Sequence, residues 1–406
     1  MSVSKDRGEC NVNQTPAANR VCIGFFGKRN SGKSSLLNAL TGQSIAVVSD
    51  VPGTTTDPVS KTMELLPIGP VVLVDTPGLD DVGDLGQLRI DKTYETMRKT
   101  DVAILVVDGR EEVSREEVQL AKELSDRRIP FLLAVNKMEA EGKRESWEAF
   151  CSEKPHIYVS AAEKIGMDEL KSELGALAQK ERQDRPLVAD LVQKGDLVIL
   201  VTPIDEAAPK GRLILPQQQT IRELLEKGAL TMVVQPGELE EALQMAVTKP
   251  KLVITDSQVF GKVNKLVPED ILLTSFSVLF ARYKGVLWEA VEGAAVLDHL
   301  EDGDKILISE GCTHHRQCGD IGTEKLPKWI LSYTGKKVEF AWSSGTEFPK
   351  ALSGYRLVIH CGACMLNEKE MSYRSESARR QGTAMTNYGT AIAHMNGILE
   401  RSIKLK

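Results

Sequence analysis

The first residues whose types and spacing could do chemistry lie near position 30. They follow the apolar run 21–26, read GKRNSGKS and fit the phosphate-binding pattern GxxxxGK[ST]. Backbone N–H groups of such a loop, and of the helix expected after it, cradle phosphates. Lys33 would reach the β- and γ-phosphates, and the Ser34 hydroxyl would hold magnesium. The loop residues expected at the nucleotide are Gly27, Asn30, Ser31, Gly32, Lys33, Ser34 and Ser35.

A second motif, Asp75-Thr-Pro-Gly78, directly follows the apolar run 71–74. At this place a carboxylate completes the magnesium shell, and a glycine N–H can sense the γ-phosphate. We therefore expect Lys33, Asp75 and Gly78 to act in nucleotide hydrolysis.

A third motif is expected to read the base. Asn136 and Lys137 follow the apolar run 131–135, where the guanine-specific NKxD motif belongs, but the fourth position is Glu139. The extra methylene of Glu139 can shift or weaken the contact with guanine. Ser160 and Ala161 follow the next strand-like run and support the same nucleotide. The expected cofactors are GTP and magnesium.

A separate cluster of sulfur and imidazole side chains lies in the last hundred residues. Cys312 and His314 are separated from His360, Cys361 and Cys364 by the 45 residues 315–359. Each group follows an apolar run, and parallel sheets build their sites at the carboxyl ends of strands, so the two groups are expected to converge.

Three thiolates and two imidazoles leave two main interpretations. One is a structural Cys₃His zinc site. The other is an iron–sulfur cluster held by three cysteines, with a histidine or an exchangeable ligand on the fourth iron. Unliganded core thiols are a third interpretation, although a CxxC beside a histidine fills an apolar core poorly. Cys318 and His315 are treated as neighbours, without a ligand role.

The elements that must position these residues alternate between strand-like and helix-period segments, which is typical of helices packed on parallel sheets. The fold class is α/β: an N-terminal P-loop domain followed by two smaller α/β domains with parallel sheets. The expected strands are 21–27, 71–74, 102–107, 131–135 and 157–159, then 197–201, 230–234 and 252–254, and finally 271–274, 306–309, 338–342 and 357–359. The expected domains are a disordered tail at 1–19, a nucleotide-binding domain at 20–180, a linker at 181–186, a dimerisation domain at 187–267 and a metal-binding domain at 268–406.

Composition limits the partners. The 406 residues carry a net charge of −6, which does not favour nucleic acid as a partner, because phosphate backbones are normally met by a basic surface. No apolar run approaches the roughly 18 residues that span a membrane. The first 19 residues lack the apolar core of a secretory signal, and seven cysteines do not suggest a disulfide framework. We expect a cytoplasmic protein that forms homodimers through its small middle domain.

The nucleotide motifs resemble the TrmE and Era branch of the translation-factor class of GTPases. The resemblance rests on Asn30 in GxxNxGKS and on the run Gly53-Thr-Thr-Thr-Asp57. It implies that Asn30 helps to hold potassium against the phosphates and that a switch threonine binds magnesium. By matching position this threonine is Thr55, with Thr54 and Thr56 as alternatives, and Thr55 is expected to act in hydrolysis together with Lys33, Asp75 and Gly78. For Asn30, the alternative to a potassium ligand is a solvated loop residue.

Hydrolysis is expected to be slow. Ras-like GTPases have a catalytic glutamine after the DxxG glycine, whereas this chain has Leu79. No other residue is evident that would orient the attacking water. The resemblance implies stimulation by potassium over sodium.

The whole pattern, a TrmE-like domain followed by a small middle domain and a CxH…HCxxC constellation, is similar to the HydF family of FeFe hydrogenase maturation. Residues 378–382 and 386–389 are also similar to a region near the cluster in that family, and a helix cap and turn is the alternative interpretation of this segment. The resemblance implies a four-iron four-sulfur cluster on Cys312, Cys361 and Cys364, with His314 and His360 as candidates for the fourth iron.

The same resemblance implies a scaffold that assembles or delivers the diiron subcluster. It would carry a transient diiron precursor, received from two radical SAM maturases and passed to FeFe hydrogenase. The alternative from another class is a TrmE- or Era-like RNA-processing GTPase with a structural zinc site. That alternative predicts a basic face and a colourless protein, whereas the cluster predicts a brown, oxygen-labile one.

Overall fold

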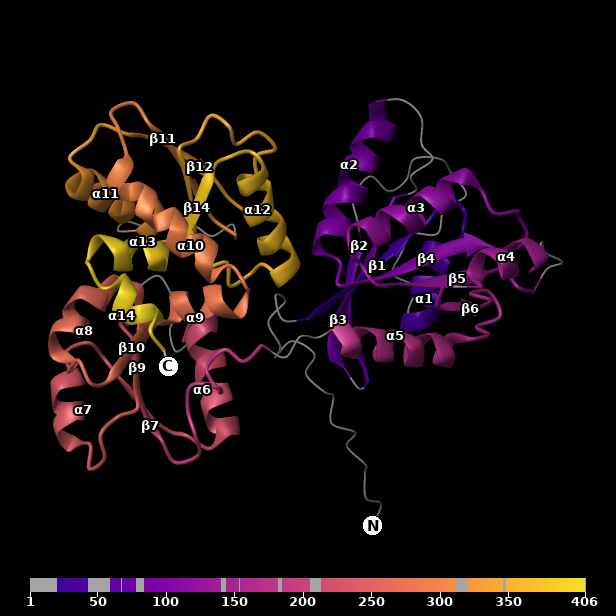
Figure 1. Ribbon diagram of the computed structural model, residues 1–406. Coiled ribbons are helices and arrows are strands. Elements are labelled where there is room, and N and C mark those ends of the chain that lie inside the picture. Colours follow the sequence, from indigo (N-terminus) through magenta and orange to yellow (C-terminus); the bar gives the residue numbers. More distant parts are fainter. Residues whose placement is uncertain are drawn as a thin grey trace, which may run out of the picture. The chain divides into compact units, whose positions relative to one another are not determined.

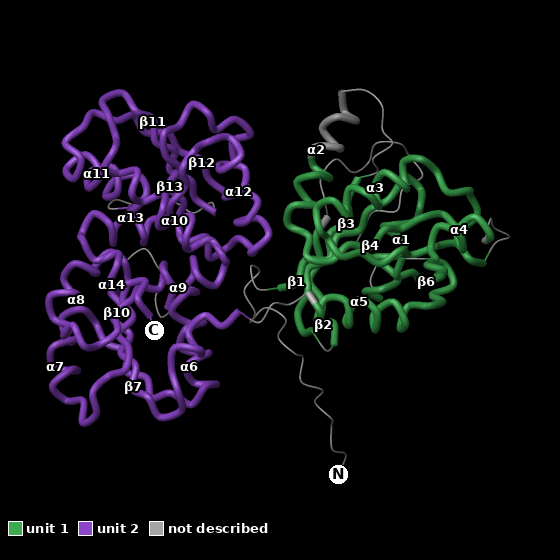
Figure 2. The backbone as a smooth tube through the Cα atoms, in the orientation of Figure 1, with its two compact units in different colours: residues 1–183 green, residues 184–406 purple. Residues whose placement is uncertain are grey.

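The computed structural model describes residues 20–42, 59–66, 68–77, 84–139, 144–152, 154–181, 185–204, 213–311, 320–345 and 348–405. The chain forms two compact units, Met1–Gln183 and Asp184–Lys406 (Figure 2). The expected tail at 1–19 and residues 182–184 of the expected linker at 181–186 lie outside the described residues. Each unit is described by itself.

The first unit is built on a six-stranded sheet in the order β2-β3-β1-β4-β5-β6. All neighbouring strands are parallel except β2 and β3, which are antiparallel. The strands are β1 (Val21–Phe26), β2 (Val59–Leu65), β3 (Gly69–Asp75), β4 (Val102–Asp108), β5 (Phe131–Asn136) and β6 (His156–Tyr158). The helices are α1 (Lys33–Thr41), α2 (Asp84–Lys99), α3 (Arg115–Asp126), α4 (Arg144–Cys151) and α5 (Met167–Glu181). Strand β2 was not expected from the sequence.

Strand β4 shows why the sheet needs helices on both faces. All seven of its residues are buried, and alternate side chains enter different cores. Ile104 packs in the core with α1 and α5, whereas Leu105 packs in the core with α3 and α4. A strand buried on both faces reads as a continuous apolar run, which is the pattern seen in the sequence.

The second unit contains two parallel four-stranded sheets, in the orders β10-β9-β7-β8 and β12-β11-β13-β14 (Figure 1). The strands are β7 (Leu197–Val201), β8 (Leu230–Val234), β9 (Leu252–Thr255), β10 (Leu272–Ser275), β11 (Lys305–Ser309), β12 (Glu339–Ser343), β13 (Leu357–His360) and β14 (Ala384–Asn387). The α-helices are α6 (Leu215–Lys227), α7 (Leu239–Met245), α8 (Phe260–Leu266), α9 (Phe276–Tyr283), α10 (Leu287–Ala294), α11 (Leu326–Thr334), α12 (Glu368–Arg380), α13 (Tyr388–Met395) and α14 (Leu399–Ile403). Short 3₁₀ turns at Ser257–Val259 and Ala295–His299 and a π-helical turn at Ile321–Lys325 complete the unit.

One strand lies in a different sheet from the one expected. Strand β10 corresponds to the strand expected at 271–274 in the third segment, but it pairs with β9 of the second sheet. The chain also returns to this sheet at its end, where α14 packs on the core that includes Ile199 and Val253. Strand β14, which was not expected, forms the edge of the third sheet next to β13.

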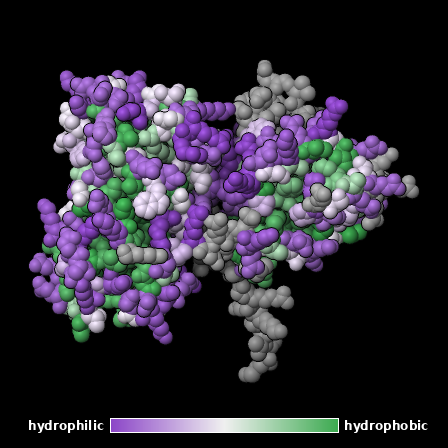
Figure 3. Space-filling model, in the orientation of Figure 1, coloured by the Kyte–Doolittle hydropathy of each residue, from purple (hydrophilic) through white to green (hydrophobic). Residues whose placement is uncertain are grey.

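The described surface is dominated by polar side chains. Figure 3 shows charged and polar groups over most of the visible face, with smaller hydrophobic areas between them. Among the described residues, no helix combines the length and apolar character that crossing a bilayer requires.

Candidate functional site

The phosphate-binding loop follows β1 and leads into α1, as expected. Gly27 has φ +148° and Gly32 has φ +95°, conformations that L side chains rarely adopt. A Cβ on Gly27 would lie 2.1 Å from the Val106 carbonyl oxygen, and one on Gly32 would lie 2.2 Å from Nδ2 of Asn136. Asn30 is also left-handed, with φ +59°. The loop therefore needs glycine both for its backbone turn and for its close approach to β4 and β5.

The side chains expected to hold phosphate and magnesium converge at the ends of β1 and β3. Lys33 is buried, and its Nζ donates to the carbonyls of Gly27 at 3.0 Å and Lys28 at 2.6 Å. The Ser34 hydroxyl donates to Oδ2 of Asp75 at 2.5 Å. Oδ1 of Asp75 is buried without a hydrogen-bond partner among the described residues, and burial raises the pKa of this carboxyl. A buried carboxylate oxygen without a donor, beside a serine hydroxyl, fits magnesium, a hard cation that binds oxygen.

The base-binding motif is tied directly to the phosphate loop. Nδ2 of Asn136 donates to the Ser31 carbonyl at 3.0 Å, and its Oδ1 accepts from the Ala161 N–H at 3.0 Å. Asn136 and Ser160 are buried, whereas Glu139 is exposed. The three sequence motifs, expected from spacing alone, therefore meet at one edge of the sheet.

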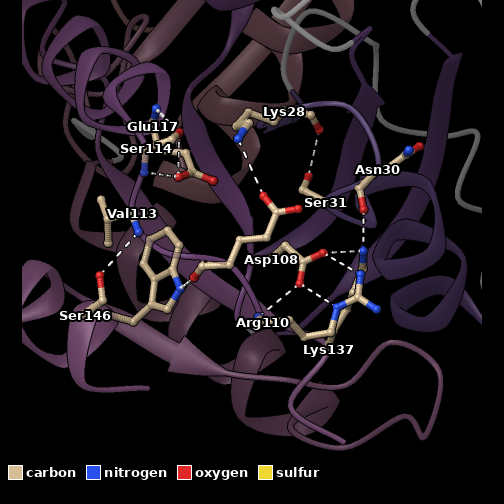
Figure 4. A network of polar contacts seen from close by, with 12 residues as sticks. Lys28, Asn30, Ser31, Asp108, Arg110, Val113, Ser114, Glu117, Lys137 and Ser146 are labelled. Carbon is tan, nitrogen blue, oxygen red and sulfur yellow. Dashed lines mark hydrogen bonds and ion pairs between the residues drawn. The ribbon is translucent and has the colours of Figure 1, made fainter. Parts of the chain in front are cut away.

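A charged network supports this arrangement (Figure 4). Asp108, at the end of β4, accepts from Nε and Nη2 of Arg110 at 2.9 and 2.7 Å and from Nζ of Lys137 at 2.6 Å. Burial alone would raise the pKa of Asp108, but the hydrogen bonds from Arg110 and Lys137 lower it to about 2. Nζ of Lys137 also donates to the Asn30 carbonyl at 2.5 Å. Lys137 thus fixes the loop at Asn30, a contact that the sequence motif did not predict.

The structure describes only some of the other residues that are expected at the nucleotide. Ser35 lies in the first turn of α1 and is half-buried. Thr55 and Gly78, with the alternatives Thr54 and Thr56, lie outside the described residues.

The second candidate site is the loop after β13, which contains Cys361 and Cys364. Sγ of Cys361 accepts two backbone N–H groups, from Gly311 at 3.1 Å and from Ala363 at 3.4 Å. Ala363 itself is left-handed, with φ +54°. Burial raises the pKa of the Cys361 thiol to about 11, with the two N–H groups acting in the opposite direction, and burial raises that of Cys364 as well. Thiols that receive backbone N–H groups fit a soft metal or an iron–sulfur cluster.

The residues expected in the first half of the constellation fall outside the described part of the chain. Cys312 and His314, with Cys318 and His315, lie outside the described residues. Gly311 is the last described residue before them, and its N–H contacts Cys361. Within the described parts of the chain, no three His, Cys, Asp or Glu side chains converge as a metal site.

His360 is brought to the site, but both of its ring nitrogens have partners. Nδ1 lies 2.9 Å from the Cys361 carbonyl oxygen, and Nε2 lies 2.9 Å from Nη1 of Arg374. The carbonyl requires a proton on Nδ1, and the guanidinium donates to Nε2, so the imidazole is neutral with no nitrogen lone pair left for a metal. Burial, reinforced by the Arg374 charge, lowers the pKa of His360 to about 3.

Arg374 on α12, which contacts His360, is the centre of a network of buried contacts. It is fully buried and pairs with Glu370, four residues earlier, at 2.8 Å. It also donates to the Gly345 carbonyl at 3.1 Å and lies over the Phe348 ring at 5.0 Å. In the sequence this pair looks like an ordinary helix-surface i, i+4 ion pair, which is why sequence reasoning missed it.

Lys284, the C-terminal cap of α9, is a further buried charge at the cysteine loop. Its Nζ donates to the carbonyls of Ala363 and Leu366, and burial lowers its pKa to about 8, with Cys364 and Cys361 acting in the opposite direction. Lys284, His360, Cys361, Thr386 and Asn387 line one pocket. No sequence motif marked Lys284.

The pattern expected near the cluster at 378–389 divides into two parts. Gln381 caps α12 and Gly382 turns the chain with φ +70°, so residues 378–382 form a helix end and turn. Thr386 and Asn387 line the pocket beside Cys361, and the Tyr388 hydroxyl contacts buried Glu310 at 3.3 Å.

The fold and loop geometry of the first unit define a P-loop GTPase domain. Residues 22–137 match the model of the 50S ribosome-binding GTPase family. The MnmE tRNA-modification GTPase of Clostridioides difficile is 31% identical over 157 residues, which are 38% of this chain and 34% of that protein. That of Heliobacterium modesticaldum is 32% identical over 207 residues, which are 50% of this chain and 40% of that protein. The chain thus spans about a third to two fifths of the length of these relatives.

Similar solved structures are also GTPases. An Aquifex aeolicus Era variant bound to GDP and aluminium fluoride aligns with 53% of this chain and 92% of its own, at 18% identity and a TM-score of 0.36. The G domain of the Thermotoga maritima iron transporter FeoB aligns with 39% of this chain and 99% of its own, at 25% identity and a TM-score of 0.31. At such TM-scores these likenesses support no inference about function.

The second unit identifies the family. Residues 187–285 match the hydrogen maturase F dimerization domain, and residues 288–405 match the hydrogen maturase F tetramerization domain. Together the two models cover more than half of the chain. The chain belongs to the hydrogen maturase F family, with a GTPase domain of the TrmE and Era type at its N-terminal side.

Proposed function

We propose that this chain is a GTP-hydrolysing scaffold that binds a four-iron four-sulfur cluster and assembles or delivers the diiron subcluster of FeFe hydrogenase. Its family membership supports the role in hydrogenase maturation. The observation that carries the cluster is the Cys361 loop, where two backbone N–H groups point at one thiol sulfur. Hydrogen bonds to sulfur are one means by which proteins tune iron–sulfur clusters.

In the GTPase domain, Lys33 would leave the two carbonyls that it now contacts and bind the β- and γ-phosphates. Ser34 and Asp75 would hold magnesium, which neutralises charge on the phosphates. Thr55 and Gly78 would complete the site as the switch threonine and the γ-phosphate sensor. With Leu79 after Gly78, hydrolysis is proposed to be slow, and Asn30 is proposed to hold a stimulating potassium ion.

Base selectivity depends on Asn136 and Glu139. The two hydrogen bonds of Asn136 leave its position fixed by Ser31 and Ala161. Glu139 is exposed and would accept from guanine as the aspartate of NKxD does. Competition of GTP against ATP and XTP tests this assignment: displacement by ATP as strong as that by GTP would contradict it.

In the cluster domain, the proposed ligands are Cys312, Cys361 and Cys364. Because both nitrogens of His360 have partners, we propose His314 as the histidine candidate for the fourth iron and His360 as a residue that orients the loop. The cluster would supply an open iron for the cargo. The proposed partners are FeFe hydrogenase, two radical SAM maturases and a second copy of this chain.

Anaerobic iron and sulfide analysis with EPR tests the cluster. We expect about four irons and four sulfides per chain, as a four-iron cluster requires. Cys312→Ala, Cys361→Ala and Cys364→Ala should each lose most of the iron and change the EPR signal. Cys151→Ala is the matched control, because Cys151 is a buried thiol in the GTPase domain core. Bound zinc without sulfide would overturn the proposal in favour of a structural zinc site.

A further inference from the structure

A buried lysine from another part of the unit donates hydrogen bonds to the cysteine loop. Lys284 lies within two residues of the end of the dimerization-domain match, whereas the loop lies in the tetramerization-domain match. Its side chain is buried, and Nζ donates to the carbonyls of Ala363 and Leu366. One lysine thus connects the end of α9 to the loop between Cys361 and α12.

These two bonds fix the direction of the loop's peptide groups. The Ala363 carbonyl faces Lys284, while the Ala363 N–H faces Sγ of Cys361 at 3.4 Å. The Leu366 N–H donates back to the Ala363 carbonyl at 3.1 Å, which closes the turn. Without the lysine, the Ala363 carbonyl would keep only the Leu366 N–H, and the Leu366 carbonyl would lose its buried donor. A buried acceptor without a partner destabilises the conformation that buries it.

The burial of the positive charge of Lys284 needs a physical explanation. Burying an ammonium group is strongly unfavourable unless an opposite charge compensates it. In the described part of the chain, Lys284 forms no ion pair with a carboxylate; Cys364, Cys361 and Glu368 are the acidic groups whose charge acts on it. The thiols would bring full negative charge to this place only as thiolates, the form in which they bind metal.

We propose that Lys284 is a positioning residue for the cluster: it clamps the Cys361–Leu366 turn and supplies the positive charge that offsets the thiolate-bound cluster. The inference rests on the proposed cluster at Cys361 and Cys364. A nearby positive charge stabilises the more negative, reduced state, so Lys284 raises the reduction potential. It also makes the dimerization domain part of the cluster site.

The test compares Lys284→Met, which keeps the length of the side chain but removes its charge and donors, with Lys284→Arg, which keeps both. Lys227→Met is the control, since Lys227 is an exposed lysine at the end of α6 in the same unit. Hydrogen exchange of residues 361–367 is measured on the metal-free full chain. We expect at least about tenfold faster exchange in Lys284→Met, partial rescue in Lys284→Arg and no change in Lys227→Met.

The second readout is the midpoint potential of the reconstituted cluster. Lys284→Met should make the cluster harder to reduce, with about a tenfold change in the redox equilibrium, which is about 59 mV for one electron. Unchanged exchange and potential in Lys284→Met would overturn the inference. If the wild-type chain takes up no iron and sulfide, the proposed function fails, while exchange in the metal-free chain still decides whether the clamp exists. If Lys284→Met does not fold, Lys284→Gln against Lys284→Arg makes the same comparison.

Discussion

Replacement of Arg374 by methionine gives the sharpest test of the packing under the cysteine loop. The guanidinium is fully buried and bonds to Glu370, His360 and Gly345. Oε2 of Glu370 already lacks a partner among the described residues, so removal of Arg374 leaves this carboxylate buried and uncompensated. Breaking a buried ion pair from one side costs about 3–5 kcal/mol.

The chain offers a matched control on the same helix. Arg380 and Glu376 form an i, i+4 ion pair at 2.7 Å, with the same spacing as Arg374 and Glu370, but their side chains are 73% and 48% exposed. An exposed pair of this kind contributes about 0.3–0.5 kcal/mol. Arg380→Met should therefore leave the free energy of unfolding almost unchanged.

Tryptophan fluorescence can report the second unit selectively. Three of the four tryptophans, Trp288, Trp329 and Trp342, lie in that unit, and Trp147→Phe removes the fourth. In this background Arg374→Met should lower the urea midpoint by about 1 M or more, for a slope of about 3 kcal/mol/M. Double replacement of Arg374 and Glu370 by apolar residues should recover much of the loss. Equal midpoints for Arg374→Met and Arg380→Met would refute the reasoning.

Three further predictions concern the other elements. Asn30→Ala should abolish the difference between potassium and sodium in GTP hydrolysis rate; equal wild-type rates in the two salts would contradict the potassium site. Asp108→Asn should remove the loss of stability of the first unit as pH falls from about 4 to about 2, because an acid whose pKa is lowered in the folded state stabilises it only while ionised; amide exchange of β4 against pH measures this. Leu230→Lys with Val233→Lys should convert a dimer to monomer in sedimentation, because these side chains are exposed on the edge strand β8, a template for strand pairing; a persistent dimer would locate the interface elsewhere.

The sequence determined most of the GTPase site by itself. Glycines and a lysine at fixed spacing allow few backbone conformations, and motifs at the ends of parallel strands must meet at one edge of the sheet. Gly27, Lys33, Asp75 and Asn136 could therefore be placed before any coordinates. Local apolar runs likewise indicated nearly all of the parallel strands.

The tertiary structure alone decided what lies around the cysteine loop. Strand β10 is a short apolar run that fits either sheet in sequence, and only its pairing with β9 assigns it. Lys284 and Arg374 look like ordinary surface cations in sequence, because burial and long-range partners leave no local signal. Lys284 contacts Ala363, which is 79 residues away in the sequence. Arg374 bonds both to Glu370 on its own helix and to Nε2 of His360. Spacing identified residues of a metal-ligating type, whereas the charges and hydrogen bonds that orient them depend on the packing of distant segments.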